Sequence, residues 1–515
     1  MKKRFLKNTL VLTLTYQILR VIGIYFIAFL SGKIGTEGVG LYQLILSVYV
    51  LAATFASSGL GIAVSRLTAE SIGKSRHQTT SNVLRRAIVI GLCLSAVFGA
   101  VLYVFADFIG LTFLGDPRSI LSIRMLAPGL PFMAVSSSLQ GYFYGLRKVI
   151  KPATQMIFEQ IVRLLVIMMV INAFVPLGLE YACFAIILSS MISEALSCAY
   201  AFILYIHEKR QQHMAVAKEP GVTKKILKIS VPIAISAYIR TILRTAENML
   251  IPLGLKKNGA SHKDALSQFG MIGMVMPILF FPSGLWTAVG TLLVPELSEA
   301  SALNNSQRVK SIFAAVFQMS VMLSVLFCGI FIAFAKDFGV LIYQNAEIGR
   351  LLLWLAPLVP LIYLDFVVDS MLSGLDQQLA TLKINILDSA LRVVLIFTLV
   401  PRFGLVAFIV IMYISAVLNG TLSIRRLLKA SHTGIRYVDW IIKPLMCIAA
   451  SALIVRLLFY LLPFGAVMTA ANLTLKILLL CIIYTALLFI TQCLKKTNIV
   501  WLKKLISRRR DIVNR

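Results

Sequence analysis

The sequence predicts an all-α polytopic membrane protein with about fourteen transmembrane helices. Of its 515 residues, 59% are hydrophobic and 14% are charged, and the mean hydropathy is +0.88. Apolar windows of about 20 residues, enough to cross a hydrocarbon core of roughly 30 Å, recur along the whole chain. An internal repeat groups these helices into two homologous six-helix lobes, followed by two further helices.

The expected spans follow the apolar windows in chain order. Lys2, Lys3 and Arg4 precede the first window, as in a signal peptide, but its run to Leu30 is too long and no A-x-A site follows, so we expect it to be retained. The expected spans are Thr9–Leu30, Gly40–Ser65, Ala87–Gly110, Ile120–Tyr142, Pro152–Val175, Tyr181–Ile206, Ile226–Leu253, Leu266–Val294, Ser311–Ala335, Leu351–Gly374, Ala380–Val400, Gly404–Leu427, Ile441–Leu462 and Leu473–Cys493.

Basic residues gather in alternate segments between the spans. In a soluble chain the net charge of +29 would suggest nucleic acid. Here Arg85, Arg86, Lys209 and Arg210, among others, fall on the side that we take as cytoplasmic, which is typical of membrane topology signals. We therefore expect both termini in the cytoplasm and membrane lipids, not nucleic acid, as partners. The sequence gives no prediction of an oligomeric state.

The two halves of the chain are related by a repeat at a shift of 229 residues. Six spans per half is an even number, so both copies cross the membrane in the same sense, which is the parallel-repeat arrangement of some secondary transporters. The matches are Leu126-Ala127-Pro128 with Leu355-Ala356-Pro357, Gly145-Leu146 with Gly374-Leu375, Glu159 with Asp388 and Arg163 with Arg392. The predicted organisation is an N-terminal lobe (1–206), a cytoplasmic linker (207–225), a C-terminal lobe (226–428), two extra helices (429–494) and a basic cytoplasmic tail (495–515).

Catalytic and metal chemistry has little support. The five histidines lie in or near loops without metal-ligand spacing, and the seven cysteines lie in apolar windows without a C-x-x-C spacing. Gly73-Lys74-Ser75 resembles the end of a phosphate-binding loop, but position 68 is Thr and no strand precedes it. We therefore expect a protein that is not an enzyme, with no catalytic residue, no metal site and no cofactor.

Arginines inside the spans are the first candidate site. The span Ile226–Leu253 carries Arg240 and Arg244, and Arg20 lies mid-way through the first span, where the repeat pairs it with Arg244. A charge at the bilayer centre costs about 2.5–3.5 kcal/mol, so these side chains should face a partner or a water-filled cavity. Guanidinium binds phosphate oxygens in a two-pronged geometry, so Arg20, Arg240 and Arg244 are candidates for binding a pyrophosphate or carboxylate.

The alternative role for these arginines is structural. Glu247 lies on roughly the same helical face as Arg240 and Arg244. Pairing of the arginines with Glu247, Glu194 or Asp365 would lock helices together without binding substrate. If Glu247 neutralises Arg244, Arg240 is the arginine better able to bind phosphate.

Carboxylates inside the spans form a second group. Glu159 with Arg163 and Asp388 with Arg392 are spaced i, i+4, so we expect structural ion pairs. Asp365 and Asp369 are also one turn apart, but the repeat places Ser136 and Gln140 at their positions. Carboxylates present in one half alone suit a coupling cation, sodium or a proton, or else pair with Arg240 or Arg244. The ion-coupling candidates are Asp365, Asp369, Asn385 and Asp388.

Three motifs carry a family resemblance. They are Gly35-Thr36-Glu37-Gly38-Val39-Gly40-Leu41-Tyr42-Gln43-Leu44, Ser57-Ser58-Gly59-Leu60 and Val64-Ser65-Arg66-Leu67. Together with the repeat and the number of spans, they resemble the stage V sporulation protein B and polysaccharide transporter family of the multidrug/oligosaccharidyl-lipid/polysaccharide (MOP) exporter superfamily, which is related to the lipid II flippase.

The resemblance implies a flippase of the bacterial cytoplasmic membrane, active in cell-wall, polysaccharide or spore synthesis. Such a protein moves an undecaprenyl-pyrophosphate-linked oligosaccharide or peptidoglycan precursor by alternating access. In lipid II flippases, cavity arginines hold the pyrophosphate and the last two helices form a groove for the polyprenyl tail. Arg20 and Arg244, or Arg240, match the arginine-bearing helices, but this chain lacks an arginine within its second span, since Arg66 lies at the end.

Two other functions remain open at this point. A cation-coupled multidrug exporter of the same superfamily would use the carboxylates, although the arginines and the two extra spans argue against it. A membrane enzyme such as a glycan polymerase would need a catalytic cluster at the membrane surface, and the sequence offers none.

Overall fold

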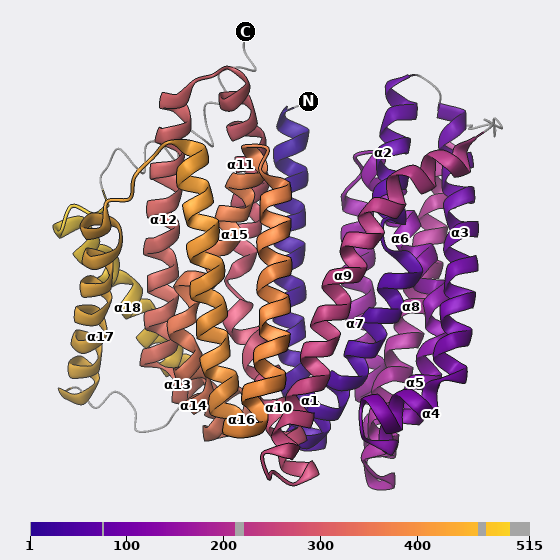
Figure 1. Ribbon diagram of the computed structural model, residues 1–515, viewed down its shortest axis with the longest axis horizontal. Helices are drawn as coiled ribbons and strands as arrows, with labels where there is room; N and C mark the ends of the chain where they lie inside the picture. Colours follow the sequence, from indigo (N-terminus) through magenta and orange to yellow (C-terminus); the bar gives the residue numbers. More distant parts are fainter. Residues whose placement is uncertain (1, 75–76, 212–220, 462–469, 495–515) are drawn as a thin grey trace. The chain divides into compact units, whose positions relative to one another are not determined.

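The computed structural model describes residues 2–74, 77–211, 221–461 and 470–494, and over these residues the chain is helical with no strand (Figure 1). The predicted all-α class is confirmed. The expected tail 495–515 and residues 212–220 of the expected linker lie outside the described residues. The helices are α1 (Lys2–Ser57), α2 (Leu60–Gly73), α3 (His77–Val104), α4 (Ala106–Phe108), α5 (Ile120–Leu126), α6 (Leu130–Gly145), α7 (Ile150–Phe174), α8 (Leu179–Gln211), α9 (Val222–Lys257), α10 (His262–Phe280), α11 (Ser283–Ala302), α12 (Ser306–Ala333), α13 (Ala335–Tyr343), α14 (Ala346–Leu355), α15 (Val359–Gly374), α16 (Gln378–Ser431), α17 (Lys443–Leu461) and α18 (Ala470–Ile490).

Eleven helical segments in the described part of the chain are long and apolar enough to cross a membrane. Two of them, Leu10–Gly73 and Gln378–Ser431, each cover two of the expected spans. Their helices are broken by glycines with positive φ, Gly35 at 68° and Gly404 at 61°. The protein is a multi-pass membrane protein, while the number fourteen and the orientation of the termini stay predictions.

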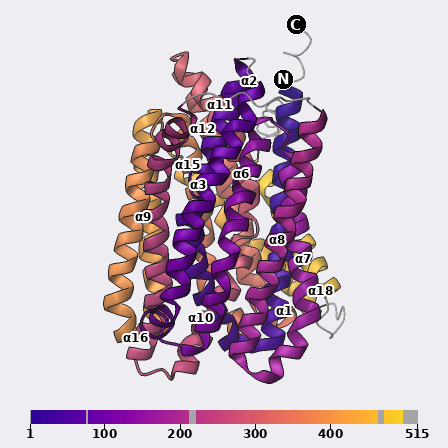
Figure 2. The same ribbon diagram turned by 90° about the vertical axis from the view of Figure 1, so that its right-hand side faces the viewer.

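The described residues form two compact units. The first unit comprises Leu10–Gly273 with Val393–Ala407, and the second comprises mainly Met274–Arg392 and residues 408–494. The core of the first unit includes Leu60, Tyr142, Phe143 and Ile226. Because α9 packs on α2 and α3, it belongs by its contacts to the first unit. Figure 2 shows α3, α6 and α8 of this unit, and α6 packs against both of the others.

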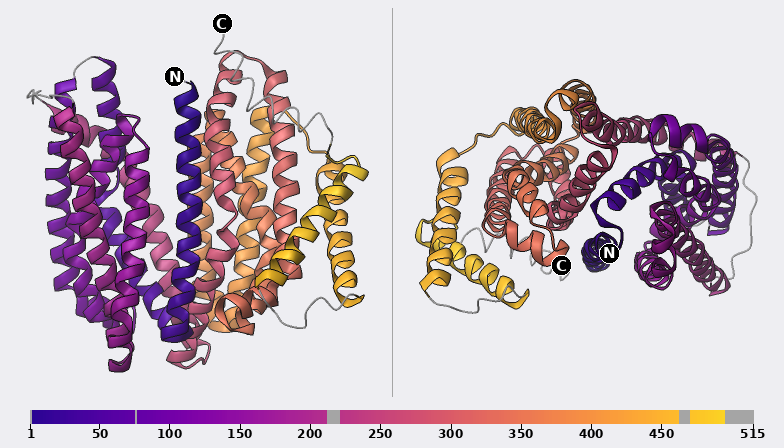
Figure 3. Two further views of the ribbon diagram at one scale, coloured as in Figure 1. Left: turned by 180° about the vertical axis from the view of Figure 1, so that it is seen from behind. Right: turned by 90° about the horizontal axis from the view of Figure 1, so that it is seen from below.

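The second unit is built around α12 and α15. These two helices pack on each other, and α11 packs on α15. The pair α17 and α18 lies at the edge of the unit, where both helices contact α12 (Figure 3). The two helices expected to follow the repeat are therefore present, and they pack against the second unit.

The backbone repeats at the shift of 229 residues that the sequence predicts. The short 3₁₀ segments Ala127–Gly129 and Ala356–Leu358 lead into α6 and α15, which match each other residue for residue. After these helices, Arg147 and Asp376 both have a positive φ, of 58° and 59°. Since left-handed backbone is uncommon for residues other than glycine, its recurrence at the same shift confirms the repeat.

A polar cluster joins α1, the segment before α5 and the start of α10 within the first unit. The Asp116 side chain, which is 1% exposed, is 2.7 Å from Nη2 of Arg118 and 2.9 Å from Nε2 of His262. Arg118 also binds Glu37 at 2.9 Å. Burial alone would raise the pKa of Asp116, but the hydrogen bonds with Arg118 and His262 outweigh it and hold the pKa below its usual value.

Replacing Asp116 by asparagine is expected to lower stability in a pH-dependent way. Because the pKa is lowered in the fold, the carboxylate stabilises the protein above its ordinary pKa of about 3.9, and the contribution is lost as the pH falls through the lowered value. Asp116→Asn should cost about 3 kcal/mol at pH 7, since it breaks a buried ion pair. Thermal unfolding between pH 3 and 7 should show the difference from wild type shrinking toward acid, whereas exposed Asp264→Asn should change little. A difference independent of pH would contradict this account.

Candidate functional site

The second expected span is interrupted in the first unit. It reads as one apolar window, but α1 ends at Ser57 and α2 begins at Leu60. Gly59 has φ 78° and ψ −22°, and a Cβ there would lie 2.5 Å from the carbonyl oxygen of Ser230 on α9. Only glycine meets both conditions, because the left-handed conformation costs other residues about 1–2 kcal/mol and the space is closed. The break therefore depends on the residue at position 59.

The second half has an interruption at the corresponding place. The first spans of the two halves are related by a shift of 224 residues, five fewer than the 229 of the later spans: Arg20 corresponds to Arg244, and Gly35 to Gly259, which also has a positive φ. The same shift carries Gly59 onto Ser283, the first residue of α11. Phe281 and Pro282 separate α10 from α11, and Tyr363 Oη donates a hydrogen bond to the Leu279 carbonyl at 2.5 Å. In transporters, interrupted spans at matching positions of two halves point to the binding site.

A pocket of about 300 Å³ lies beside the break in the first unit. Its polar lining consists of one arginine, Arg240, and hydroxyl groups. The hydroxyl-bearing residues are Tyr49 and Thr54 of α1, Ser57 and Ser58 at the break, and Thr241 of α9. The guanidinium of Arg240 can donate hydrogen bonds to phosphate or carboxylate oxygens, whereas the Thr54 and Ser57 hydroxyls donate to the Val50 and Ala53 carbonyl oxygens, at 2.6 Å and 2.8 Å. The pocket is therefore suited to an anionic group.

Arg240 has no counter-charge within the described part of this unit. Its side chain is exposed, and no ion pair or hydrogen bond joins it to a described residue. An arginine within an apolar span needs an anion or water to offset its charge. The geometry therefore favours Arg240 as the group that meets an anionic ligand in this pocket.

The other charged residues proposed from the sequence for this site differ from Arg240 in their surroundings. Arg244 lies one turn further along α9 and is exposed, but it does not line the pocket. Glu247 is 9% exposed, and Arg20 on α1 is half-buried. Both Glu247 and Arg20 have interaction partners. The predicted roles of Arg20 and Arg244 in binding substrate stay predictions.

The second unit contains a cluster of the four residues that the sequence proposes for ion coupling. Asp365 and Asp369 lie on α15 and face the two arms of α16 on either side of Gly404. Asn385 Nδ2 donates to Asp369 Oδ2 at 3.2 Å, and Asn419 Nδ2 donates to Asp365 Oδ2 at 3.2 Å and to Asn385 Oδ1 at 3.4 Å. The remaining oxygen of each carboxylate, Oδ1, is buried and accepts no hydrogen bond from a described residue.

Asp388 completes this set, which we call the Asp365 cluster: Asp365, Asp369, Asn385, Asp388 and Asn419. Ser415 Oγ donates to Asp388 Oδ1 at 2.7 Å, and Arg392 Nε lies 3.7 Å from Asp388 Oδ2. Arg392 therefore lies beside Asp388, while Asp365 and Asp369 form no ion pair with a described residue. The described residues contain no group of three or more His, Cys, Asp or Glu side chains close enough to hold a metal ion. A monovalent cation or protons fit this arrangement better than a tightly held divalent ion.

The first unit carries the matching ion pair with one further buried carboxylate, Glu194, which is 6% exposed and close enough to Glu159 and Arg163 to interact with both. Arg163 Nη2 binds Glu159 Oε1 at 2.8 Å on α7, as the i, i+4 spacing predicts. Ser136 and Gln140 occupy the positions that correspond to Asp365 and Asp369. Because the second unit has Asp365, Asp369 and Asp388 here and the first has Glu159 and Glu194, the larger surplus of negative charge belongs to the second unit.

Substitution of Gly59 tests the helix break. Gly59→Ala is expected to destabilise the protein by at least about 1–2 kcal/mol, because it adds a left-handed alanine and a contact with the Ser230 carbonyl. Gly73→Ala is the control, since a Cβ there meets nothing within 4 Å. The measurement is the midpoint of thermal unfolding of the two purified variants. Equal midpoints for both would show that the break tolerates a side chain.

Known proteins resemble this chain along most of its length. A family model described as "Polysaccharide biosynthesis protein" matches residues 5–301. Stage V sporulation protein B of Bacillus subtilis is 28% identical over 407 residues, covering 78% of this chain and 79% of that protein. Lipid II flippase MurJ of the same organism is 23% identical over 494 residues, covering 88% and 87%.

Solved structures share the fold. Lipid II flippase MurJ in an inward closed conformation has a TM-score of 0.69 at 13% identity, covering 93% of this chain and 98% of that one. An inward-facing multidrug resistance MATE family transporter of the MOP superfamily has a TM-score of 0.63 at 16% identity, covering 81% and 100%. The resemblance inferred from the opening motifs and the repeat is confirmed, and the chain belongs to the polysaccharide biosynthesis protein family.

Proposed function

We propose that the chain is a flippase that moves a lipid-linked oligosaccharide or peptidoglycan precursor across the cytoplasmic membrane by alternating access. The observation that carries the proposal is Arg240 in a hydroxyl-lined pocket beside a broken span. A pyrophosphate linker, such as that of an undecaprenyl-pyrophosphate glycan, offers oxygens that a guanidinium binds in a two-pronged geometry. The relatives named as a lipid II flippase and as MATE transporters support movement of a substrate. Since relatives with a stated activity are transporters, the chain is not an enzyme.

The Asp365 cluster supports a coupling role for sodium or protons. Two buried carboxylate oxygens without a hydrogen-bond donor among the described residues would repel each other when charged. A bound cation or proton removes this cost. Because ligand binding shifts a conformational equilibrium in proportion to its different affinity for the two states, such an ion can drive alternating access.

A cation-coupled multidrug exporter is the second candidate. The same surplus of carboxylates would suit a cationic drug, and this observation favours it. Arg240 argues against it, because an arginine with no counter-charge among the described residues repels a cationic substrate.

Depletion of the protein in its own host separates these functions. If it is a flippase, depletion should raise the pool of lipid-linked glycan on the inner leaflet, measured by lipid extraction and by accessibility to a membrane-impermeant probe. Drug accumulation should stay unchanged. Increased drug accumulation with a normal precursor pool would favour the exporter and reject the flippase.

A further inference from the structure

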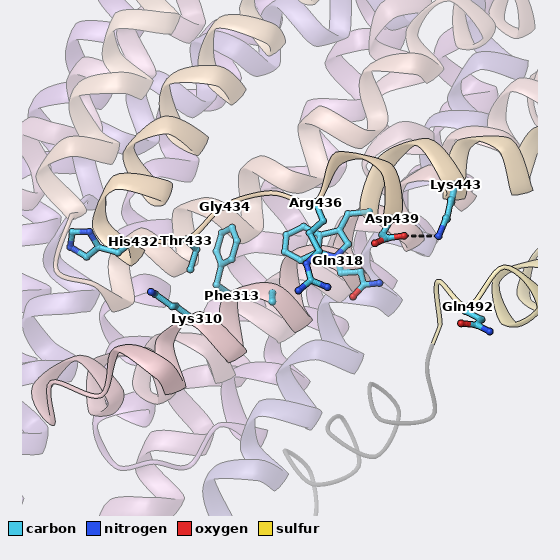
Figure 4. A pocket seen from close by; sticks show the side chains of 12 residues that line it. Lys310, Phe313, Gln318, His432, Thr433, Gly434, Arg436, Asp439, Lys443 and Gln492 are labelled. Carbon is cyan, nitrogen blue, oxygen red and sulfur yellow. Dashed lines mark hydrogen bonds and ion pairs between the residues drawn. The ribbon is translucent and has the colours of Figure 1, made fainter.

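A second, larger pocket lies in the second unit and plays no part in the proposed translocation. Its volume is about 500 Å³, and it lies between the first turns of α12 and the segment that joins α16 to α17. Lys310 comes from α12, and Arg436 comes from the joining segment (Figure 4). Lys310 lies near the start of the candidate membrane span Ser306–Ala333, and Arg436 lies two residues before the candidate span Val438–Leu461.

The pocket has an excess of positive charge. Lys443 lines it, but Asp439 neutralises this lysine at 2.6 Å, as the dashed line in Figure 4 shows. Lys310 and Arg436 are exposed and form no ion pair with a described residue. Two cationic groups are therefore available to one ligand in the pocket. An anion that accepts several hydrogen bonds, such as a phosphate, matches them best.

The pocket has a rigid aromatic floor. The Trp440 side chain is 6% exposed, and its ring centroid lies 6.2 Å from that of Phe313 and 5.8 Å from that of Phe317. Phe313 also lies between Lys310 and Arg436 in the view of Figure 4. Packing among these three aromatic rings holds them in place beside the two cationic side chains.

An apolar surface adjoins the cationic pocket. Tyr437 and Val438, which follow Arg436 directly, are 63% and 57% exposed. Tyrosine and tryptophan are enriched where membrane spans meet the headgroup layer. Basic side chains at this level attract anionic lipids. A lipid would place its phosphate between Lys310 and Arg436 and its acyl chains beside Tyr437 and Val438.

We propose that this pocket binds the phosphate of an anionic phospholipid headgroup. The exposed apolar surface next to the two cations favours a lipid over a soluble phosphate, since a free phosphate makes no use of it. The binding is independent of the translocated substrate and does not rest on the proposed function.

Thermal unfolding of the full chain in detergent tests the proposal. Dioleoyl phosphatidylglycerol is titrated into wild type, into Lys310→Gln/Arg436→Gln and into the matched control Arg425→Gln/Lys429→Gln. The control removes the same charge from exposed positions near the end of α16. Dioleoyl phosphatidylcholine corrects for general lipid effects. We expect wild type and control to be stabilised by phosphatidylglycerol at similar concentrations. The pocket variant should need about thirtyfold more, since it loses two basic side chains that attract anionic lipid.

Two outcomes would reject the proposal. An equal response of pocket variant and control to phosphatidylglycerol overturns the proposal. Stabilisation by inorganic phosphate at matched ionic strength, lost in the pocket variant and without preference for phosphatidylglycerol over phosphatidylcholine, assigns the pocket to soluble phosphate and rejects a lipid. If the double variant does not fold, Lys310→Gln alone serves, because its side chain is exposed on α12. The single variant Arg436→Lys keeps the positive charge and should therefore retain most of the response to phosphatidylglycerol.

Discussion

Arg240→Ala is expected to lower translocation of a pyrophosphate-linked lipid by about 100-fold or more. The pocket would lose two charge-assisted hydrogen bonds, each contributing about 1.5–3 kcal/mol, and every 1.4 kcal/mol corresponds to a factor of ten. Folding should be preserved, because the side chain is exposed and has no described partner. Arg240→Lys should recover part of the activity, since lysine keeps the charge but loses the two-pronged geometry. Transport by the purified, reconstituted variants measures the loss.

The controls for this prediction come from the same helix. Lys228→Ala removes an exposed positive charge three turns before Arg240 and should leave transport near the wild-type rate. Arg244→Ala should cost less than Arg240→Ala, because Arg244 does not line the pocket. If Arg240→Ala transports as fast as Lys228→Ala, the pocket is not the site of the pyrophosphate.

Asp365→Asn with Asp369→Asn is expected to abolish coupling to an ion gradient. A carboxylate and a cation about 4 Å apart attract by about 4 kcal/mol at an effective dielectric constant of 20, so the variant should bind the ion about a thousandfold more weakly. In wild type, an imposed sodium or proton gradient should accelerate transport. In the variant the rate should equal that without a gradient. Asp376→Asn is the control, because Asp376 is exposed and asparagine tolerates its left-handed backbone.

Thermal stability gives an independent reading of the same cluster. An ion that binds the native state raises the unfolding midpoint, by an amount that grows with its concentration. Sodium, compared with choline at equal ionic strength, should stabilise wild type and Asp376→Asn but not the double variant, if sodium is the coupling ion. With protons in that role, the midpoint should respond to pH instead. If the midpoint of the double variant responds to sodium and to pH as wild type does, the cluster has no part in coupling.

Much of the candidate site can be predicted from sequence periodicity. Asp365 and Asp369 are one turn apart on a helix, and the repeat shows that their positions are carboxylates in one half alone. The i, i+4 pair Glu159 and Arg163 is local, so a helix suffices to place its side chains together. The repeat itself is preserved in the backbone, down to the left-handed residues after α6 and α15. These features depend on short-range geometry, which the sequence encodes directly.

Features set by long-range packing escape sequence analysis. Asn419 and Ser415 reach the Asp365 cluster because the chain turns back at Gly404. Their one signal in the sequence is a polar side chain within an apolar window. The break at Gly59 has a local signal, since Ser57-Ser58-Gly59 interrupts the apolar window and a Ser-Gly pair favours a turn, but a 20-residue hydropathy window averages over it and does not report φ. The hydroxyl groups around Arg240 come together through that break.

The most direct test of the account is transport by the purified chain in liposomes. A fluorescent undecaprenyl-pyrophosphate glycan is placed in both leaflets, and a membrane-impermeant reagent quenches the outer one. If the chain is a flippase, wild-type protein should expose nearly all of the lipid to quenching, while Arg240→Ala vesicles should approach that level about 100-fold more slowly and protein-free vesicles should stop near half. Quenching that stops at half with folded wild-type protein, under sodium and proton gradients of either direction, would contradict the proposed function.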